Sequence, residues 1–161
     1  MYIVDDKYYN KKEALKRCNE FMKSSVVFFS DGSFVKGKEK GGYGFVSVGS
    51  IYVEKSGVDV AKSPVEMELK AIKHTLAYLN MNREKLNDLD IVIFNDCLNA
   101  IGKIKKYVEN PTGANELLDE IHFLLTSLSD KTISICWVKK ESLKYHEKVD
   151  SLSKMARDMV R

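Results

Sequence analysis

The sequence has few cysteines, few prolines and no long apolar run, and each scarcity excludes a class of protein. Its three cysteines include no Cys-x-x-Cys pair, so they fit reduced thiols and exclude a disulfide framework or a zinc site. Two prolines and nine glycines exclude a collagenous or a Pro/Gly-rich disordered chain. No apolar run approaches the ~20 residues that cross a bilayer, and the sequence has acidic residues near its start, where a signal peptide has a basic region. We therefore expect a cytoplasmic protein with no membrane partner.

The composition that remains is that of an ordinary globular domain. Hydrophobic residues make up 44% and charged residues 30% of 161 residues, a length that fits one domain. The net charge of +3 is unevenly distributed, because residues 131–161 hold eight basic and four acidic side chains and the segment 36–40 adds three lysines. This distribution favours a polyanionic partner on one face. A solvated lysine-rich surface is the alternative.

Hydrophobic periodicity predicts an α/β fold. The order after residue 24 is β-β-β-α-β-α-α-β-α, which implies a five-stranded mixed sheet with helices on both faces. We assign residues 1–24 to an N-terminal extension with a short helix and residues 25–161 to the domain. The expected strands are 25–30, 42–49, 51–58, 89–95 and 132–138, and the expected helices are 11–23, 64–79, 97–108, 114–128 and 146–160.

The helix that begins at Pro64 has the clearest signal. Ser63 and Glu66 form a capping-box pattern around a proline at the first helical position. Apolar residues then recur at steps of four and three through Leu79, which is typical of an amphipathic helix.

Four carboxylates occupy places from which their side chains can converge. Asp31 and Asp96 each end a predicted buried strand, Glu68 borders the buried face of the helix from Pro64, and Asp150 lies early in the last helix. Converging carboxylates repel one another unless a cation compensates them. Hard divalent cations such as Mg²⁺ take oxygen ligands of this kind.

Each of these acids also has a purely structural interpretation. Asp31 can shape a turn with Gly32, and Asp96 can cap the helix that follows it. Glu68 can be a solvated edge residue, and Asp150 can simply favour the helix dipole. All four positions together favour the convergent interpretation.

The sequence resembles type 1 ribonuclease H over about residues 25–160. The similarity rests on short motifs that occur in the same order as in the family, and no single one is diagnostic. They are Phe29-Ser30-Asp31-Gly32-Ser33, Gly41-Gly42-Tyr43-Gly44, Glu66-Met67-Glu68-Leu69, Phe94-Asn95-Asp96-Cys97, Cys136-Trp137-Val138-Lys139 and Glu147-Lys148-Val149-Asp150.

The resemblance implies a ribonuclease H-like fold and a metal-dependent endonuclease. Asp31, Glu68, Asp96 and Asp150 would be both the catalytic residues and the ligands of two Mg²⁺ or Mn²⁺ ions. The substrate implied is the RNA strand of an RNA–DNA hybrid, cut by hydrolysis to a 5′-phosphate, and we expect a monomer. Two alternatives keep the fold: a resolvase-like DNA nuclease, and a nucleic-acid-binding module with weak activity.

The sequence departs from the family at positions around this site. At the position where the family has a loop histidine, this sequence has Lys140-Glu141. His146 lies four residues before Asp150, where the family usually has asparagine. A surface position at the start of the helix is the structural interpretation of His146.

Polar residues that contact RNA 2′-hydroxyls in the family are also replaced, by Val65 and Leu98. These replacements predict weaker selectivity for RNA. For substrate contacts the sequence offers Gly32, Ser33, Ser63, Glu141 and His146.

Overall fold

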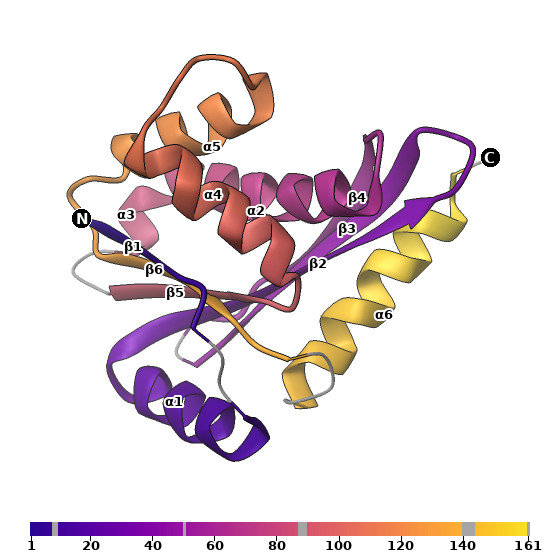
Figure 1. Ribbon diagram of the computed structural model, residues 1–161. Coiled ribbons are helices and arrows are strands. Elements are labelled where there is room, and N and C mark those ends of the chain that lie inside the picture. Colours follow the sequence, from indigo (N-terminus) through magenta and orange to yellow (C-terminus); the bar gives the residue numbers. More distant parts are fainter. Residues whose placement is uncertain (8–9, 50, 87–89, 140–143, 161) are drawn as a thin grey trace.

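The computed structural model describes residues 1–7, 10–49, 51–86, 90–139 and 144–160. After residue 24 its helices and strands follow the predicted order with one addition, the short helix α3, and a further strand, β1, lies before residue 24 (Figure 1). The elements are β1 (Tyr2–Asp5), α1 (Lys11–Ser24), β2 (Ser25–Val35), β3 (Lys40–Val48), β4 (Glu54–Val60), α2 (Pro64–Met81), α3 (Arg83–Leu86), β5 (Asp90–Asn95), α4 (Leu98–Glu109), α5 (Glu116–Ser127), β6 (Ile133–Trp137) and α6 (Lys144–Asp158).

The sheet has six strands in the order β1-β6-β5-β2-β3-β4. The pairs β1–β6, β6–β5 and β5–β2 are parallel, and β2, β3 and β4 form an antiparallel meander. The prediction of five strands was wrong by one strand, because β1 pairs in parallel with β6 from Tyr2↔Ile133 to Asp5↔Cys136. A strand of four residues is too short to show a hydrophobic period, so only its partner across the sheet defines it.

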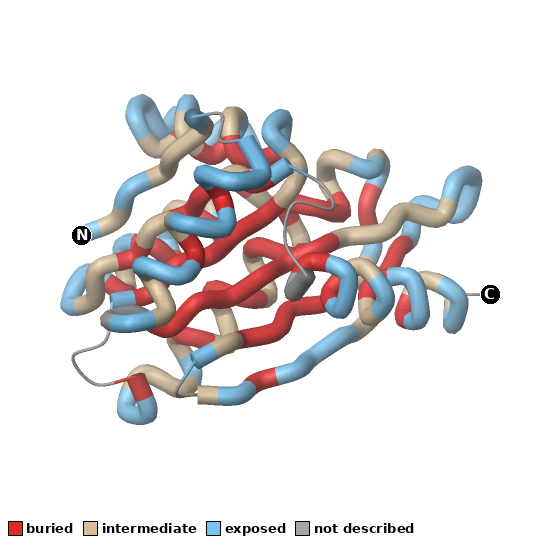
Figure 2. Tube along the Cα trace, turned by 90° about the horizontal axis from the view of Figure 1, so that it is seen from below, coloured by how far each residue is buried: buried red, intermediate tan, exposed pale blue. Residues whose placement is uncertain are grey.

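Helices cover both faces of this sheet. Helices α2, α4 and α5 lie on one face, and α1 and α6 lie on the other (Figure 1). Side chains of β2 alternate between the two cores: Val26 and Phe28 belong to the first, and Val27 and Phe29 to the second. The buried strands run through the centre of the molecule between these two layers (Figure 2).

Strand β2 is longer than its apolar run predicts, and this changes the position of Asp31. Its pairing with β3 continues to Val35↔Lys40, whereas its pairing with β5 ends at Phe29↔Phe94. Asp31 therefore lies inside β2, two residues beyond the last pair with β5, and does not end the strand.

Two glycines let helices approach the sheet closely on either side of Asp31. A Cβ atom at Gly32 would lie 2.5 Å from the carbonyl oxygen of Met67 on α2, and one at Gly42 would lie 2.2 Å from the amide nitrogen of Arg157 on α6. Any side chain at these positions would push the helix away. Within the described ranges, none of the helices combines the length and apolarity that a membrane span requires.

Candidate active site

Asp31 points from β2 toward α6. It lies two residues after Phe29 on the same strand face, and only 4% of its surface is exposed. The hydroxyl group of Ser153 on α6 donates a hydrogen bond to Asp31 Oδ2 over 2.9 Å. The position is therefore fixed from both sides, by the strand backbone and by α6.

Asp96 follows directly after β5, in a turn that hydrogen bonds hold rigid. The Asn95 side-chain amide donates to the carbonyl oxygen and to the hydroxyl group of Ser30, each over 3.1 Å. The indole N–H of Trp137 donates to the carbonyl oxygen of Asp96 over 3.1 Å. The cap of α4 is Cys97, whose Sγ accepts a hydrogen bond from the amide of Ala100. The interpretation of Asp96 as the helix cap is thus wrong.

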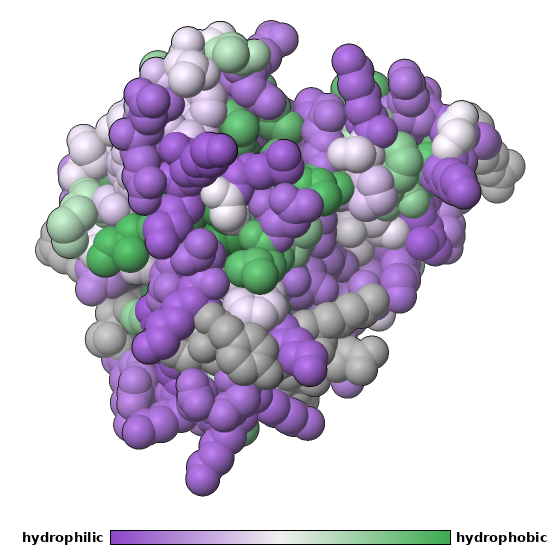
Figure 3. Space-filling view, in the orientation of Figure 1, coloured by the Kyte–Doolittle hydropathy of each residue, from purple (hydrophilic) through white to green (hydrophobic). Residues whose placement is uncertain are grey.

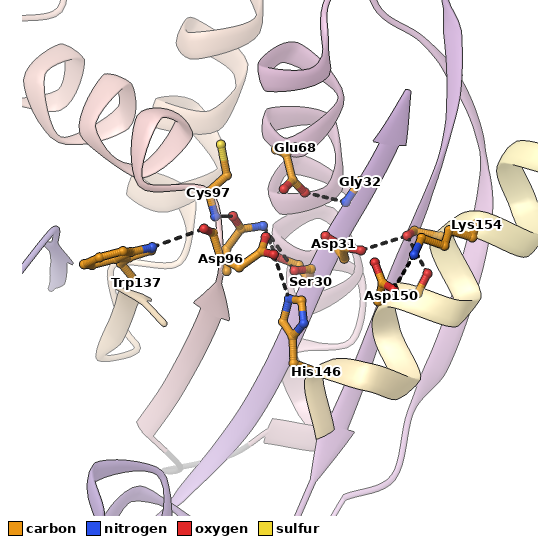
Figure 4. Close-up of polar contacts among 12 residues, drawn as sticks. Ser30, Asp31, Gly32, Glu68, Asp96, Cys97, Trp137, His146, Asp150 and Lys154 are labelled. Atoms are coloured by element: carbon orange, nitrogen blue, oxygen red, sulfur yellow. Dashed lines mark hydrogen bonds and ion pairs between the residues drawn. The ribbon is translucent and has the colours of Figure 1, made fainter. Parts of the chain in front are cut away.

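Glu68 lies in the second turn of α2 and reaches the site across β2. Only 9% of its surface is exposed, so the interpretation of this residue as a solvated edge residue is wrong. Its Oε1 accepts a hydrogen bond from the backbone N–H of Gly32 (Figure 4). The close approach of α2 to β2 at Gly32 therefore also positions this carboxylate.

Asp150 completes the group from the second turn of α6. Its Oδ2 forms an ion pair of 2.8 Å with Lys154 Nζ one helical turn later. Its side chain is 25% exposed, which makes it more accessible to solvent than Asp31. Its backbone carbonyl oxygen lies 2.9 Å from the Ser153 hydroxyl oxygen, so this carbonyl and Asp31 Oδ2 share the one hydroxyl proton.

The structure brings all four acidic side chains together at one cavity of about 500 Å³ (Figure 4). They come from β2, α2, α6 and the turn after β5, and the basic side chains of Lys36 and Lys154 lie beside them. The lining residues are Asp31, Gly32, Ser33, Phe34, Lys36, Pro64, Glu68, Asp96, Asp150 and Lys154.

Crowding of these carboxyl groups disfavours their charged forms. Burial and the nearby Asp96 raise the pKa of Asp31 from its ordinary value to about 7. Burial, with Asp31 and Asp96 beside it, raises the pKa of Glu68 well above its ordinary range. A cation at this place would reverse both effects, because it would compensate the charge that burial penalises.

His146 is buried at this site, whereas the sequence suggested a position at the surface. It is 1% exposed, so the interpretation as a surface residue is wrong. It lies in the first turn of α6, and its Nε2 is 3.4 Å from Asp96 Oδ2. One ligand atom each from Asp31, Asp96 and His146 lie within 4.8 Å of one another. Burial lowers the pKa of His146, but Asp96, Asp31 and Asp150 outweigh burial and raise this pKa above its ordinary value.

The other residues predicted to contact substrate lie in different places. Gly32 and Ser33 line the acidic cavity. Ser63 lines a neighbouring cavity of about 580 Å³ on the other side of the α2 N-terminus, and its hydroxyl oxygen caps α2 by accepting the amide of Glu66. Glu141 lies outside the described residues.

Sequence reasoning missed three residues that support this site. Ser153 and Lys154 follow Asp150 by three and four positions, a spacing that places them on the same face of α6. Arg157 lies one further turn along and donates to Ser33 Oγ over 3.1 Å. Helical spacing from Asp150 was a signal that would have found all three.

The four acids that line the cavity all belong to the motifs that resemble those of ribonuclease H. A comparison of the whole sequence with family models tests this resemblance. The model described as RNase H matches residues 23–157. The chain belongs to the ribonuclease H family. No curated protein sequence matches it.

Membership of the ribonuclease H family implies a nuclease with a nucleic acid substrate, and the donor set suits the divalent cations that this family generally uses. Four carboxylates supply hard oxygen ligands. Burial and repulsion by Asp96 raise the pKa of Asp31 although His146 opposes them, so the protein alone does not fully compensate the negative charge at this place. The residues present therefore fit a bound divalent metal ion.

Proposed function

We propose that this ribonuclease H family member is a metal-dependent endonuclease that hydrolyses the RNA strand of RNA–DNA hybrids and leaves 5′-phosphate ends. The observation that carries the proposal is the meeting of Asp31, Glu68, Asp96 and Asp150 at one cavity from four separate segments of the chain. Repulsion among them costs folding free energy, so a structural role does not account for the arrangement. Their proposed role is to bind the metal ions.

In this proposal the protein's own groups orient the acids. Two Mg²⁺ or Mn²⁺ ions held by the four acids would supply the chemistry, since they would lower the pKa of an attacking water and stabilise charge on the leaving oxygen. The Ser153 hydroxyl group fixes the rotamer of Asp31, and the N–H of Gly32 fixes that of Glu68. The hydrogen-bonded turn around Asn95 holds Asp96 at the end of β5.

Basic side chains at the rim of the cavity support a polyanionic substrate. Lys36 on the β2–β3 turn and Lys154 on α6 line it, and Arg157 lies next to Ser33. Lysine and arginine neutralise backbone phosphates and release counterions. Hydrophilic side chains also cover most of the face shown in Figure 3, where they interrupt the hydrophobic areas.

A nuclease of the same site that also cuts DNA is the second candidate. Leu98, 44% exposed at the start of α4, and the half-buried Val65 at the start of α2 offer no donor or acceptor to a 2′-hydroxyl group. These two side chains favour relaxed discrimination between RNA and DNA strands.

The deciding experiment incubates the protein with end-labelled RNA–DNA hybrid, duplex RNA, single-stranded RNA, duplex DNA and a DNA junction. We expect cleavage of the RNA strand in the hybrid with Mg²⁺ or Mn²⁺ and none with EDTA. Cleavage of the DNA substrates would support the second candidate. Tight binding of the hybrid without cleavage under either metal would instead indicate a binding module.

Asp96→Asn tests the assignment of the acids. We expect it to lower the cleavage rate by about 100-fold or more, because an amide is a weaker metal ligand than a carboxylate. Asp90→Asn is the matched control, since Asp90 is exposed at the opposite end of β5. Comparable activity of Asp96→Asn and wild type would contradict the proposal.

A further inference from the structure

His146 holds a buried imidazole nitrogen beside two of the acids that line the cavity, Asp31 and Asp96. The residue is 1% exposed, and within the described ranges its Nε2 is buried without a hydrogen-bond partner. Asp96 Oδ2 lies 3.4 Å from this nitrogen and forms an ion pair with it when His146 is protonated. The two atoms do not have the geometry of a hydrogen bond. A buried polar atom left without a hydrogen bond costs stability, so its presence needs an explanation.

We propose that His146 is a metal ligand, and that with Asp31 and Asp96 it forms a mixed imidazole–carboxylate site that prefers Mn²⁺ to Mg²⁺. The inference rests on the proposed function, because it concerns the ion held by two of the same acids. It goes further by adding a nitrogen ligand from α6 and a metal preference.

The distances fit one ion. Octahedral ligands about 2.1 Å from a metal lie about 3 Å apart when adjacent and a little over 4 Å apart when opposite. One atom each of Asp31, Asp96 and His146 lie within 4.8 Å of one another, and the His146–Asp96 distance is 3.4 Å. Small rotations of these side chains are enough to complete the coordination.

The direction of the imidazole supports the same conclusion. Figure 4 shows the His146 ring, from the first turn of α6, pointing toward Asp96 and the centre of the group of acids. Asp31 reaches this centre from β2, where Ser153 holds one of its oxygens. Strand β2, the turn after β5 and helix α6 thus bring one donor atom each close together.

The chemistry of the donors sets the preference. Mg²⁺ binds oxygen ligands and keeps several waters. An imidazole nitrogen favours first-row transition ions, and affinities for such sites rise from Mn²⁺ along the series. A site with His146 therefore gains more affinity for Mn²⁺ than for Mg²⁺.

The competing explanation is that His146 is a resident cation that pairs with Asp96 and never binds metal. It predicts that Mn²⁺ bound at the acids has no histidine nitrogen in its coordination sphere. Electron spin-echo envelope modulation of Mn²⁺ distinguishes the two explanations, because it detects a directly bound nitrogen and needs no substrate.

The first measurement uses the wild-type protein with one equivalent of Mn²⁺. We expect a nitrogen coupling that changes to the ¹⁵N pattern when the protein is labelled with [¹⁵N]histidine. A spectrum without this coupling overturns the inference. Because only wild-type protein is used, the result does not depend on the folding of a variant.

The second measurement compares Mn²⁺ and Mg²⁺ affinities of His146→Asn with those of wild type by calorimetric titration. We expect Mn²⁺ binding to weaken about tenfold or more, with little change for Mg²⁺, and we expect the nitrogen coupling to disappear. His122→Asn is the matched control, since His122 lies on α5 and packs edge-on against Tyr2. Equal losses for both ions, or none for either, overturn the preference for Mn²⁺.

These results are separate from those of the cleavage assay. A histidine nitrogen on Mn²⁺ in a protein that cuts no nucleic acid supports the ligand and contradicts the nuclease. Hybrid cleavage with no histidine nitrogen on Mn²⁺ supports the nuclease and contradicts the ligand.

Discussion

Asp31 and Glu68 both bear an electrostatic cost of the site, because burial and neighbouring acids raise the pKa of each carboxyl group. The cost is clearest for Asp31. It is 4% exposed, and burial together with Asp96 raises its pKa to about 7. The folded protein therefore holds this proton more tightly than the unfolded chain does. As the pH rises from about 4 to about 7 the proton is lost, and the free energy of unfolding of the metal-free protein decreases.

We predict that Asp31→Asn stabilises the metal-free protein at neutral pH by about 1–3 kcal/mol, because it removes a buried charge that Asp96 repels. The gain should shrink as the pH falls toward 4, where the wild-type carboxyl group is neutral as well. Thermal melts in EDTA across this pH range measure this gain.

The same variant tests metal binding. Mg²⁺ at ten times its Kd should stabilise the wild type by about 1.4 kcal/mol and Asp31→Asn by much less. An equal response to Mg²⁺ would show that Asp31 is not a ligand.

Gly32 lets α2 approach β2 closely enough for Glu68 to reach the site. A Cβ atom there would lie 2.5 Å from the Met67 carbonyl oxygen, which is backbone and cannot rotate away. We predict that Gly32→Ala costs about 1–3 kcal/mol by overpacking. Metal binding should also weaken, because α2 carries Glu68.

Gly102→Ala on α4 is the control, because a Cβ atom at Gly102 would meet nothing within 4 Å. This change should increase the free energy of unfolding, by at most about 1 kcal/mol. Denaturant melts of both variants check the contrast, and equal costs would contradict it.

Helix α2 carries Glu68 and begins at the cap residue Ser63, which is also predicted to contact substrate. The hydroxyl oxygen of Ser63 accepts the amide of Glu66 over 3.1 Å. We predict that Ser63→Ala costs about 1 kcal/mol, whereas Ser63→Asp retains the cap and most of the stability.

The same pair of Ser63 variants tests whether this residue contacts substrate. If its hydroxyl group binds a phosphate, Ser63→Asp should weaken hybrid binding although the helix is capped, because the added carboxylate repels the phosphate. Filter binding at constant ionic strength measures this loss. Unchanged binding by both variants would assign Ser63 to the cap alone.

Over the whole molecule, the N-terminal segment supplies a layer that the family-matched region leaves open. Helix α1 covers the sheet face next to α6, where Ala14 and Cys18 are buried beside Val27 and Phe94. Most of α1 precedes residue 23, at which the family match begins. The segment therefore completes a core that α6 covers only in part.

Two adjacent substitutions test this packing. Ala14→Glu places a charge at a position that is 1% exposed, and we predict a loss of more than about 2 kcal/mol. Leu15→Glu, at a position that is 47% exposed on the same helix, should change stability by about 0.5 kcal/mol or less. Equal melting temperatures for the two variants would show that α1 is not held against the sheet.

The sequence by itself determined the order of the elements after residue 24, apart from the short helix α3, and it singled out the four acids that meet at the cavity. Helices such as α2 have a long amphipathic period and a local cap, and buried strands such as β5 have a continuous apolar run, so their signals lie within a few neighbouring residues. Motif order carried the family resemblance, which the family match confirms. Asp31 and Asp96 stood out because each follows such a run directly.

Only the tertiary structure decided what depends on contacts between distant segments. The pairing of β1 with β6 joins residues more than a hundred positions apart, and the burial of His146 depends on how α6 crosses the sheet at Gly42 and Gly44. A single histidine at a helix start looks the same in sequence whether it faces solvent or a group of acids. Burial and ligand geometry arise from packing across the chain, and a pattern confined to neighbouring residues does not contain them.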